Sequence, residues 1–307
     1  MQIVETLAPV FLVIAFGYVL RRLHWLGDAF LAEANRVVYW IGLPAFLFSS
    51  LAVAPHGGVP MARLLTMLVG ATLASIAIAL VVGWLMGIGR ASLGTFAQAA
   101  YRGNIAYVAL PILALLPGGK GPLYTAALVT MAPLMAVFNT AAVILLLSSR
   151  PATGSESVVR RIAVELAKNP LIWACTTGWI YGYAGWPLPA WVQHTVATVG
   201  QLALPLALIC VGGALAATRL VGNRRRIGVA TLIKLVVQPF CGWVLARLMG
   251  MGAAETQVGL IMLATPAAAA SYTMTVQLGG DIELAAGGVV LTTVLSVFAL
   301  AAAVAYF

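Results

Sequence analysis

Two short segments carry the residues that could bind a small charged ligand in this largely apolar sequence. Gly103 and Asn104 form the first and Thr265 and Pro266 the second, each within a hydrophobic stretch. Glycine and proline interrupt helices, and the half-helix after a break begins with backbone N–H groups that have no intrahelical partner. Such an N-terminus carries a positive partial charge and binds anions. The two segments therefore predict an anion site made from two broken helices.

The alternative is that each segment is a simple kink whose amide groups are satisfied by neighbouring helices. Because similar interruptions occur in both halves of the chain, we favour the anion site over two independent kinks. In that case Asn104 and Thr265 cap the half-helices or donate directly to the ligand. Polar side chains near the breaks also bridge helices in membranes, and this interpretation of them stays open. The full set of candidate substrate-binding residues is Gly103, Asn104, Tyr107, Thr265, Pro266, Ser271 and Tyr272.

A second group of residues is a candidate for ion coupling or for electrostatic attraction of the ligand. Lys234 and Gln238 are four positions apart and share a helical face, and a charge within a span is a functional hypothesis by default. Lys234 could instead extend its long stem to the cytoplasmic interface. Arg102, beside the first break, attracts the anion or pairs with a carbonyl. The group consists of Arg102, Lys234, Gln238, Gln277, Asp281 and Glu5.

Acidic residues are scarce, with eight in the whole chain. Proton-coupled carriers commonly use a buried carboxylate relay. Glu5 and Asp281 are the candidates for such a role, and coupling to H⁺, to Na⁺ or to no ion stays open. The sequence has no catalytic triad, metal-ligand spacing or phosphate-binding glycine loop, so we expect no metal, no cofactor and no enzymatic activity.

The composition shows where these residues must be positioned. Of 307 residues, 62% are hydrophobic and 8% are charged, whereas soluble domains are about 45–50% apolar and about 25% charged. This excludes a soluble enzyme and favours a polytopic α-helical membrane protein. The net charge of +9 is explained by basic cytoplasmic loops, so no nucleic acid is expected as a partner.

Hydrophobic windows bounded by charges, glycines and prolines predict ten transmembrane helices. They lie near 3–20, 36–54, 62–87, 93–116, 122–148, 167–184, 191–216, 227–250, 256–277 and 283–305. Loops after odd-numbered spans hold 12 Lys or Arg residues and loops after even-numbered spans hold 3. Because basic residues favour the cytoplasm, we expect both termini to be periplasmic or extracellular, in a bacterial inner membrane.

An internal duplication is the next prediction. At an offset of 161 positions, Pro9 aligns with Pro170 and Gly17 with Gly178, and Leu43-Pro44 aligns with Leu204-Pro205. Residues 1–148 then form a first five-helix repeat, 149–166 a cytoplasmic linker, and 167–307 a second repeat. Five spans per repeat is an odd number, so the repeats are inverted, as in many secondary transporters. Prolines are expected to break or kink helices at Pro44, Pro111 and Pro205.

Four segments also resemble a known family. They are Asn104-Ile-Ala-Tyr-Val-Ala-Leu-Pro111-Ile, Lys168-Asn169-Pro170-Leu171, Leu204-Pro205-Leu-Ala-Leu, and Thr265-Pro266 through Gln277-Leu-Gly-Gly-Asp281. Across the chain the sequence resembles the auxin efflux carrier family, which includes plant PIN-type exporters and bacterial permeases for malate- or malonate-like acids. The resemblance implies ten helices in two inverted repeats, with broken crossover helices four and nine holding a carboxylate-bearing substrate. Family members often have proline before the crossover asparagine, where this chain has Gly103.

The predicted function is alternating-access transport of a small organic anion by a membrane-embedded protein, expected as a homodimer. A drug/metabolite-type exporter of a neutral or cationic metabolite is the alternative. That class has both termini in the cytoplasm, which the distribution of basic residues opposes. A membrane-embedded lipid enzyme would need clustered intramembrane His, Asp or Glu, which the sequence lacks.

Overall fold

The structure is a computed structural model that describes residues 2–53, 61–116, 121–148, 160, 164, 167–217 and 223–306. The regular secondary structure of these residues is helical, and their one extended pairing is an isolated bridge between Gly103 and Ala267. The predicted linker 149–166 lies outside the described residues except for positions 160 and 164. Among the described residues, six helices are long and apolar enough to cross a membrane, as expected for a multi-pass membrane protein. They are Val4–Arg22, Met61–Leu85, Pro122–Ser148, Ala190–Ala217, Arg224–Leu248 and Ile282–Val304.

Helix also covers the other four predicted spans, in shorter or interrupted pieces. Ile105–Ala114 and Ala253–Leu263 are shorter apolar helices. The arrangement of ten spans as an inverted repeat stays a prediction.

The chain divides into two compact units, and both draw on its first and second halves. Unit 1 comprises Met1–Leu64, Ala106–Pro133 and Asn169–Ala217, and unit 2 comprises Leu65–Ile105, Leu134–Lys168 and Thr218–Phe307. Each unit is described separately below.

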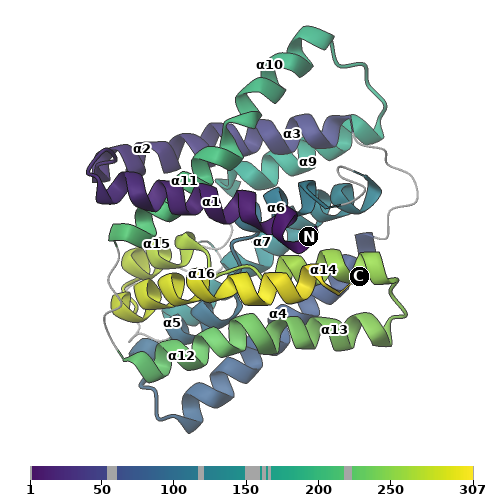
Figure 1. Cartoon of the computed structure of the whole chain (residues 1–307). Coiled ribbons are helices and arrows are strands. Elements are labelled where there is room, and N and C mark those ends of the chain that lie inside the picture. The colour runs from purple at the N-terminus through teal and green to yellow at the C-terminus, as the bar shows by residue number, and fades with distance from the viewer. Residues whose placement is uncertain are drawn as a thin grey trace. The chain divides into compact units, whose positions relative to one another are not determined.

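Unit 1 is built on close contacts between helix backbones. Its helices are α1 (Gln2–Arg22), α2 (Asp28–Val37), η1 (Val38–Gly42), α3 (Leu43–Ala52), α6 (Leu110–Ala114), α9 (Pro170–Tyr183), α10 (Ala190–Gln201) and α11 (Ala203–Ala217). Helix α1 packs along α11, and α3 packs against α9 and α10 (Figure 1). A Cβ atom on Gly212 of α11 would overlap the backbone of α1 at Ile14. Small residues permit this approach, which is the usual way for helices to pack in membranes.

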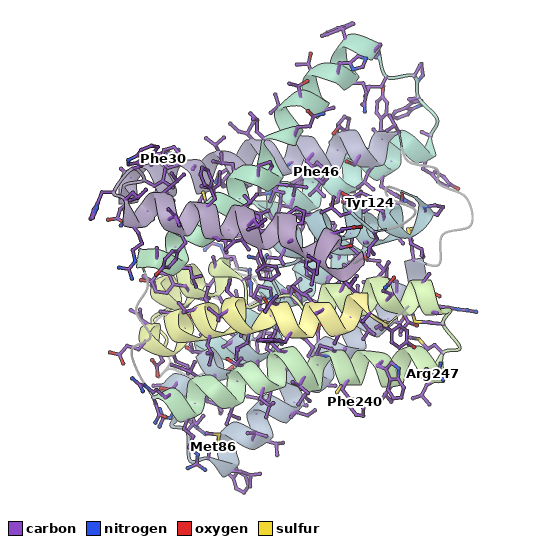
Figure 2. All side chains as sticks on the ribbon, in the orientation of Figure 1. Phe30, Phe46, Met86, Tyr124, Phe240 and Arg247 are labelled. Carbon is purple, nitrogen blue, oxygen red and sulfur yellow. The ribbon has the colours of Figure 1, made fainter. Side chains whose placement is uncertain are left out.

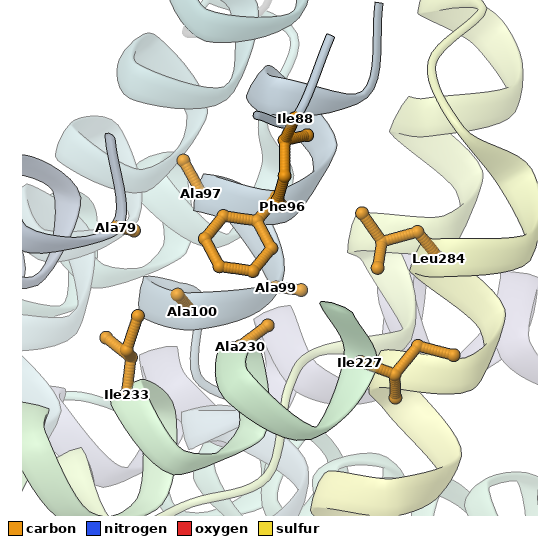
Figure 3. Packing of buried hydrophobic residues seen from close by; sticks show 10 residues of the cluster. All are labelled: Ala79, Ile88, Phe96, Ala97, Ala99, Ala100, Ile227, Ala230, Ile233 and Leu284. Atoms are coloured by element: carbon orange, nitrogen blue, oxygen red, sulfur yellow. The ribbon is translucent and has the colours of Figure 1, made fainter. Parts of the chain in front are cut away.

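Unit 2 contains the candidate site. Its helices are most of α4 (Met61–Leu85), α5 (Arg90–Tyr101), α12 (Arg224–Leu232), η3 (Ile233–Val237), α13 (Gln238–Leu248), α14 (Ala253–Leu263), α15 (Ala269–Leu278) and α16 (Ile282–Val304). The turn η2 (Ile105–Ala109) and helix α7 (Pro122–Ser148) contribute residues to both units. Figure 3 shows the buried core of unit 2, where the ring of Phe96 on α5 is surrounded by Ala79, Ala230, Ile233 and Leu284.

Helical irregularities occur close to the prolines named from the sequence. Pro44 and Pro111 each follow a π-helical turn, η1 and η2 respectively. A proline has no N–H group for the carbonyl four residues earlier, and a wider π turn accommodates that loss. Pro205 lies in the first turn of α11, just after the non-helical Leu202 that separates α10 from α11. The same arrangement of a proline after a π-helical turn occurs at Pro239, which follows η3.

The surface of α13 suits a lipid environment. The ring of Phe240 is 59% exposed and stacks on Trp243, with 5.9 Å between ring centroids. The guanidinium of Arg247 lies over the Trp243 ring at 5.9 Å, in the last turn of the helix. Figure 2 labels Phe240 and Arg247 on this helix. Tryptophan and arginine together at a helix end are typical of a membrane–water interface.

Candidate functional site

Two interruptions of helical structure in unit 2 fall at the predicted positions. Helix α5 ends at Tyr101, and helical turns resume at Ile105. Helix α14 ends at Leu263, and α15 begins at Ala269. The residues between these limits are buried, with exposed fractions from 0% at Thr265 to 8% at Asn104.

The two interruptions are joined by backbone hydrogen bonds. The Asn104 N–H donates to the Pro266 carbonyl at 2.8 Å, and the Ala268 N–H donates to the Arg102 carbonyl at 3.0 Å. These bonds form the antiparallel bridge that centres on Gly103 and Ala267. A buried backbone that leaves a helix must find other partners for its polar groups. Each segment supplies them for the other.

Glycine at position 103 is required by packing. A Cβ atom built there would lie 2.5 Å from the Thr265 hydroxyl oxygen and 3.4 Å from the Lys234 ammonium nitrogen. Gly103 is not among the residues with positive φ, so sterics alone exclude a side chain. The Lys234 ammonium nitrogen therefore lies directly against the first break.

Lys234 and Gln238 hold the ends of both helices that run into the breaks. The Lys234 side chain is 0% exposed, and its ammonium donates to the Leu263 carbonyl at 2.6 Å and to the Gln238 side-chain oxygen at 2.7 Å. The Gln238 amide nitrogen donates to the Tyr101 carbonyl at 2.9 Å. The ammonium thus stays inside unit 2 and does not extend to the interface.

The hydroxyl groups of two threonines form hydrogen bonds with backbone groups around the second break. The Ala267 N–H donates to the hydroxyl oxygen of Thr292 at 2.9 Å, and that hydroxyl donates in turn to the Gly288 carbonyl of α16 at 2.7 Å. The Thr265 hydroxyl donates to the Met262 carbonyl at 2.8 Å. Nothing in the sequence pattern marks Thr292, because it is one of many small residues in an apolar helix.

Arg102 is a second buried cation in this region, with 8% of its surface exposed. One guanidinium nitrogen donates to the Asn139 side-chain oxygen at 2.8 Å, and another lies 2.8 Å from the sulfur of Met274. Gln98, one turn before Arg102 on α5, accepts a hydrogen bond from the Thr275 hydroxyl at 3.2 Å. Gln98 was not among the sequence candidates, although its position four residues before Arg102 is a signal of a shared helical face.

The start of α15 retains polar groups without protein partners. Its N-cap residue, Ala268, provides no side-chain cap. The amides of the first helical residues, Ala269 and Ala270, have no acceptor within the helix. The Ser271 side chain is 2% exposed, and its hydroxyl has no hydrogen-bond partner among the described residues. Tyr272, the next residue, is 43% exposed.

The other sequence candidates lie elsewhere or have a partner that explains them. Tyr107 is half-buried in the part of η2 that belongs to unit 1, and Glu5 is exposed near the start of α1 in the same unit. Asp281 is the N-cap of α16, where its carboxylate accepts from the Leu284 N–H at 3.0 Å and from the Ser92 hydroxyl at 2.8 Å. The side chain of Gln277 lies outside the described residues.

A cavity of about 650 Å³ in unit 2 lies away from the breaks, between α12, α13 and α16. Its lining is apolar, with Leu235, Phe240 and Phe298 among its residues, and none of the lining residues carries a charge. A carboxylate would lose its hydration there without gaining donors. The groove therefore does not suit an anion.

The match to a known protein family defines the class: the chain is a membrane transporter and not an enzyme. The family model described as "Membrane transport protein" matches residues 2–304. The chain belongs to this family, that of the auxin efflux carriers.

Two relatives agree with this membership. A protein of Rhizobium meliloti named "Putative malonate transporter" is 26% identical over 304 residues, which cover 96% of this chain and 93% of the relative. A protein of Methanothermobacter thermautotrophicus named "Uncharacterized transporter" is 25% identical over 310 residues, which cover 96% of this chain and 95% of the relative.

Proposed function

We propose that the protein carries a small organic anion across the membrane, and that the anion binds where the two interruptions meet in unit 2. The observation that carries the proposal is the start of α15, where the buried hydroxyl of Ser271 has no partner among the described residues and its N-cap residue provides no side-chain cap. Free N–H groups and a free hydroxyl at a helix N-terminus are donors suited to a carboxylate.

The charge of the region supports an anion rather than a neutral or cationic substrate. Arg102 is buried beside the first break and brings a formal positive charge into an apolar surrounding, whereas the charge of Lys234 is compensated by the carbonyl and amide oxygens around it. The Asn104 side chain makes no hydrogen bond with any other described residue, so its amide is free to donate to a ligand. Gly103, Thr265 and Pro266 shape the backbone at this point.

Malonate is the first substrate to test. One relative is named as a malonate transporter, and a small carboxylate would bring negative charge close to the buried Arg102. The proposed mechanism is alternating access, in which one unit moves relative to the other with the anion bound. Tyr272, the exposed neighbour of Ser271 on α15, is proposed as a further contact of the substrate.

The test is uptake of radiolabelled malonate into proteoliposomes that contain the purified protein. Asn104→Ala is expected to abolish uptake, because it removes a donor that meets the carboxylate. Ser271→Ala is expected to raise KM more than about tenfold, since a hydrogen bond to a charged group contributes about 1.5 kcal/mol or somewhat more. The matched controls are Asn35→Ala and Ser148→Ala, whose side chains only donate to carbonyls of their own helices.

If both Asn104→Ala and Ser271→Ala take up malonate with wild-type kinetics, the anion does not bind at the breaks. Transport current on the same vesicles with a panel of mono- and dicarboxylates, with and without H⁺ or Na⁺ gradients, identifies the substrate and any coupled ion. A response to organic cations alone would instead support the drug/metabolite-type alternative.

We also propose that the protein lies in the bacterial inner membrane as a homodimer with both termini outside. Reporter fusions at each terminus test the orientation. An enzyme reporter that is active only in the cytoplasm should be inactive at both ends, whereas activity at both ends is the result expected for the alternative class.

A further inference from the structure

The ammonium group of Lys234 lies in an unusual surrounding for a lysine. It is fully buried, its two acceptors are the Leu263 carbonyl and the Gln238 amide oxygen, and it makes no ion pair within the described part of the chain. Removing an ammonium group from water costs several kcal/mol unless the protein supplies compensating negative charge. The oxygens around Lys234 must therefore provide that compensation without a carboxylate.

Helix ends are the source of this negative potential. Leu263 is the last residue of α14, and Tyr101, whose carbonyl accepts from Gln238, is the last residue of α5. The C-terminus of a helix is equivalent to about −0.5 of an elementary charge. Two such ends supply about −1, which the single charge of Lys234 balances. The ammonium also lies against Gly103, between the two breaks.

The same kind of oxygen cluster holds metal cations in transporters, where half-helix C-termini and unwound carbonyls coordinate Na⁺. We infer that the Lys234 ammonium is a built-in cation occupying a monovalent cation site between the ends of α5 and α14, and that shortening this side chain exposes that site. The inference deepens the proposed function by explaining how the breaks are held without a bound coupling ion at this position.

The charge and the ligands define which ions would fit. The acceptors are neutral oxygens and the potential is close to one charge, so Na⁺, K⁺ or a small alkylammonium suits the space. A divalent cation would require carboxylate ligands, and the described contacts of Lys234 include none. In the wild-type protein the site is filled by the side chain, so no monovalent salt should act there.

The test is thermal unfolding of the purified full-length Lys234→Ala variant in N-methylglucamine chloride, a cation too large to enter. The melting temperature is expected to fall by about 5–10 °C, because the variant leaves two buried helix ends without their cation. Replacing N-methylglucamine with Na⁺, K⁺ or ethylammonium at constant ionic strength should restore it in a saturable manner. The wild type should melt at the same temperature in all four salts.

Two further variants make the outcome decisive. Lys234→Met fills the space with an apolar side chain and should be destabilised without rescue by any salt. The double variant Lys234→Ala/Gln238→Glu adds a carboxylate and should respond to cations at concentrations at least tenfold lower than the single variant. Absence of any cation response in both Lys234→Ala and the double variant would overturn the inference, as would stabilisation of the wild type by Na⁺ alone. Unfolding requires no substrate, so this failure is distinguishable from failure of malonate transport.

Discussion

Gly103→Ala is the substitution that most directly tests how the two breaks are packed. The added methyl group would lie 2.5 Å from the Thr265 hydroxyl oxygen and 3.4 Å from the Lys234 nitrogen. The first distance is far below van der Waals contact, so the two segments must separate or the Thr265 side chain must rotate. Rotation would break its hydrogen bond to the Met262 carbonyl.

The expected cost follows from these contacts. Overpacking a buried site by one methyl group costs about 1–3 kcal/mol. Thr265→Ala alone should cost about 1 kcal/mol through the lost hydrogen bond. In the double variant the clashing oxygen is gone, so its total loss should stay close to that of Thr265→Ala. The interaction energy between the two positions is therefore about 1–3 kcal/mol and favours the double variant.

The assay is equilibrium unfolding of the four proteins in mixed detergent micelles, combined with malonate uptake. Gly228→Ala is the matched control, because a Cβ atom at that helical glycine meets nothing within 4 Å. It should be neutral or stabilising by up to about 1 kcal/mol. Strictly additive losses in the double variant, or a Gly103→Ala protein as stable as the wild type, would refute the packing described here.

Two further predictions concern other contacts. Thr292→Val should destabilise the protein by about 1–3 kcal/mol, because it leaves the Ala267 N–H buried without an acceptor. The control is Thr293→Val, because the Thr293 hydroxyl donates only to the Val289 carbonyl of its own helix. In detergent-induced unfolding, this control should lose less than half as much stability as Thr292→Val. Gly212→Ala should lower the melting temperature by several degrees, because the new methyl group would force α11 away from the Ile14 carbonyl of α1.

The outcomes that contradict these two predictions are equally specific. Equal stability losses for the two threonine variants would mean that Thr292 does not hold the break. A Gly212→Ala protein with an unchanged melting temperature would mean that α1 and α11 do not approach as closely as described.

Much of the site follows from residue type alone. Glycine and proline mark where a helix cannot continue, so the breaks beside Gly103 and Pro266 were predictable from local chemistry. The family is also recognisable from local motifs. Lys234 and Gln238 could be grouped because their spacing of four fixes a common helical face.

Other features needed the packed molecule. Asp281 was a candidate for ion coupling, yet its carboxylate caps α16 and bonds to Ser92, which is 189 positions away in the chain. Thr292 had no distinguishing pattern and acquires its role only because Ala267 comes within hydrogen-bonding distance.

The sequence by itself determined that this is a membrane protein, which family it belongs to and where its helices must break. These features could be predicted because hydrophobicity, helix propensity and motif content are local properties. Tertiary structure alone decided what each break is bonded to. Whether Lys234 reaches the surface or ends between the carbonyls of two helices depends on which helices pack beside it, and hydrogen bonds between distant segments leave no trace in local residue order.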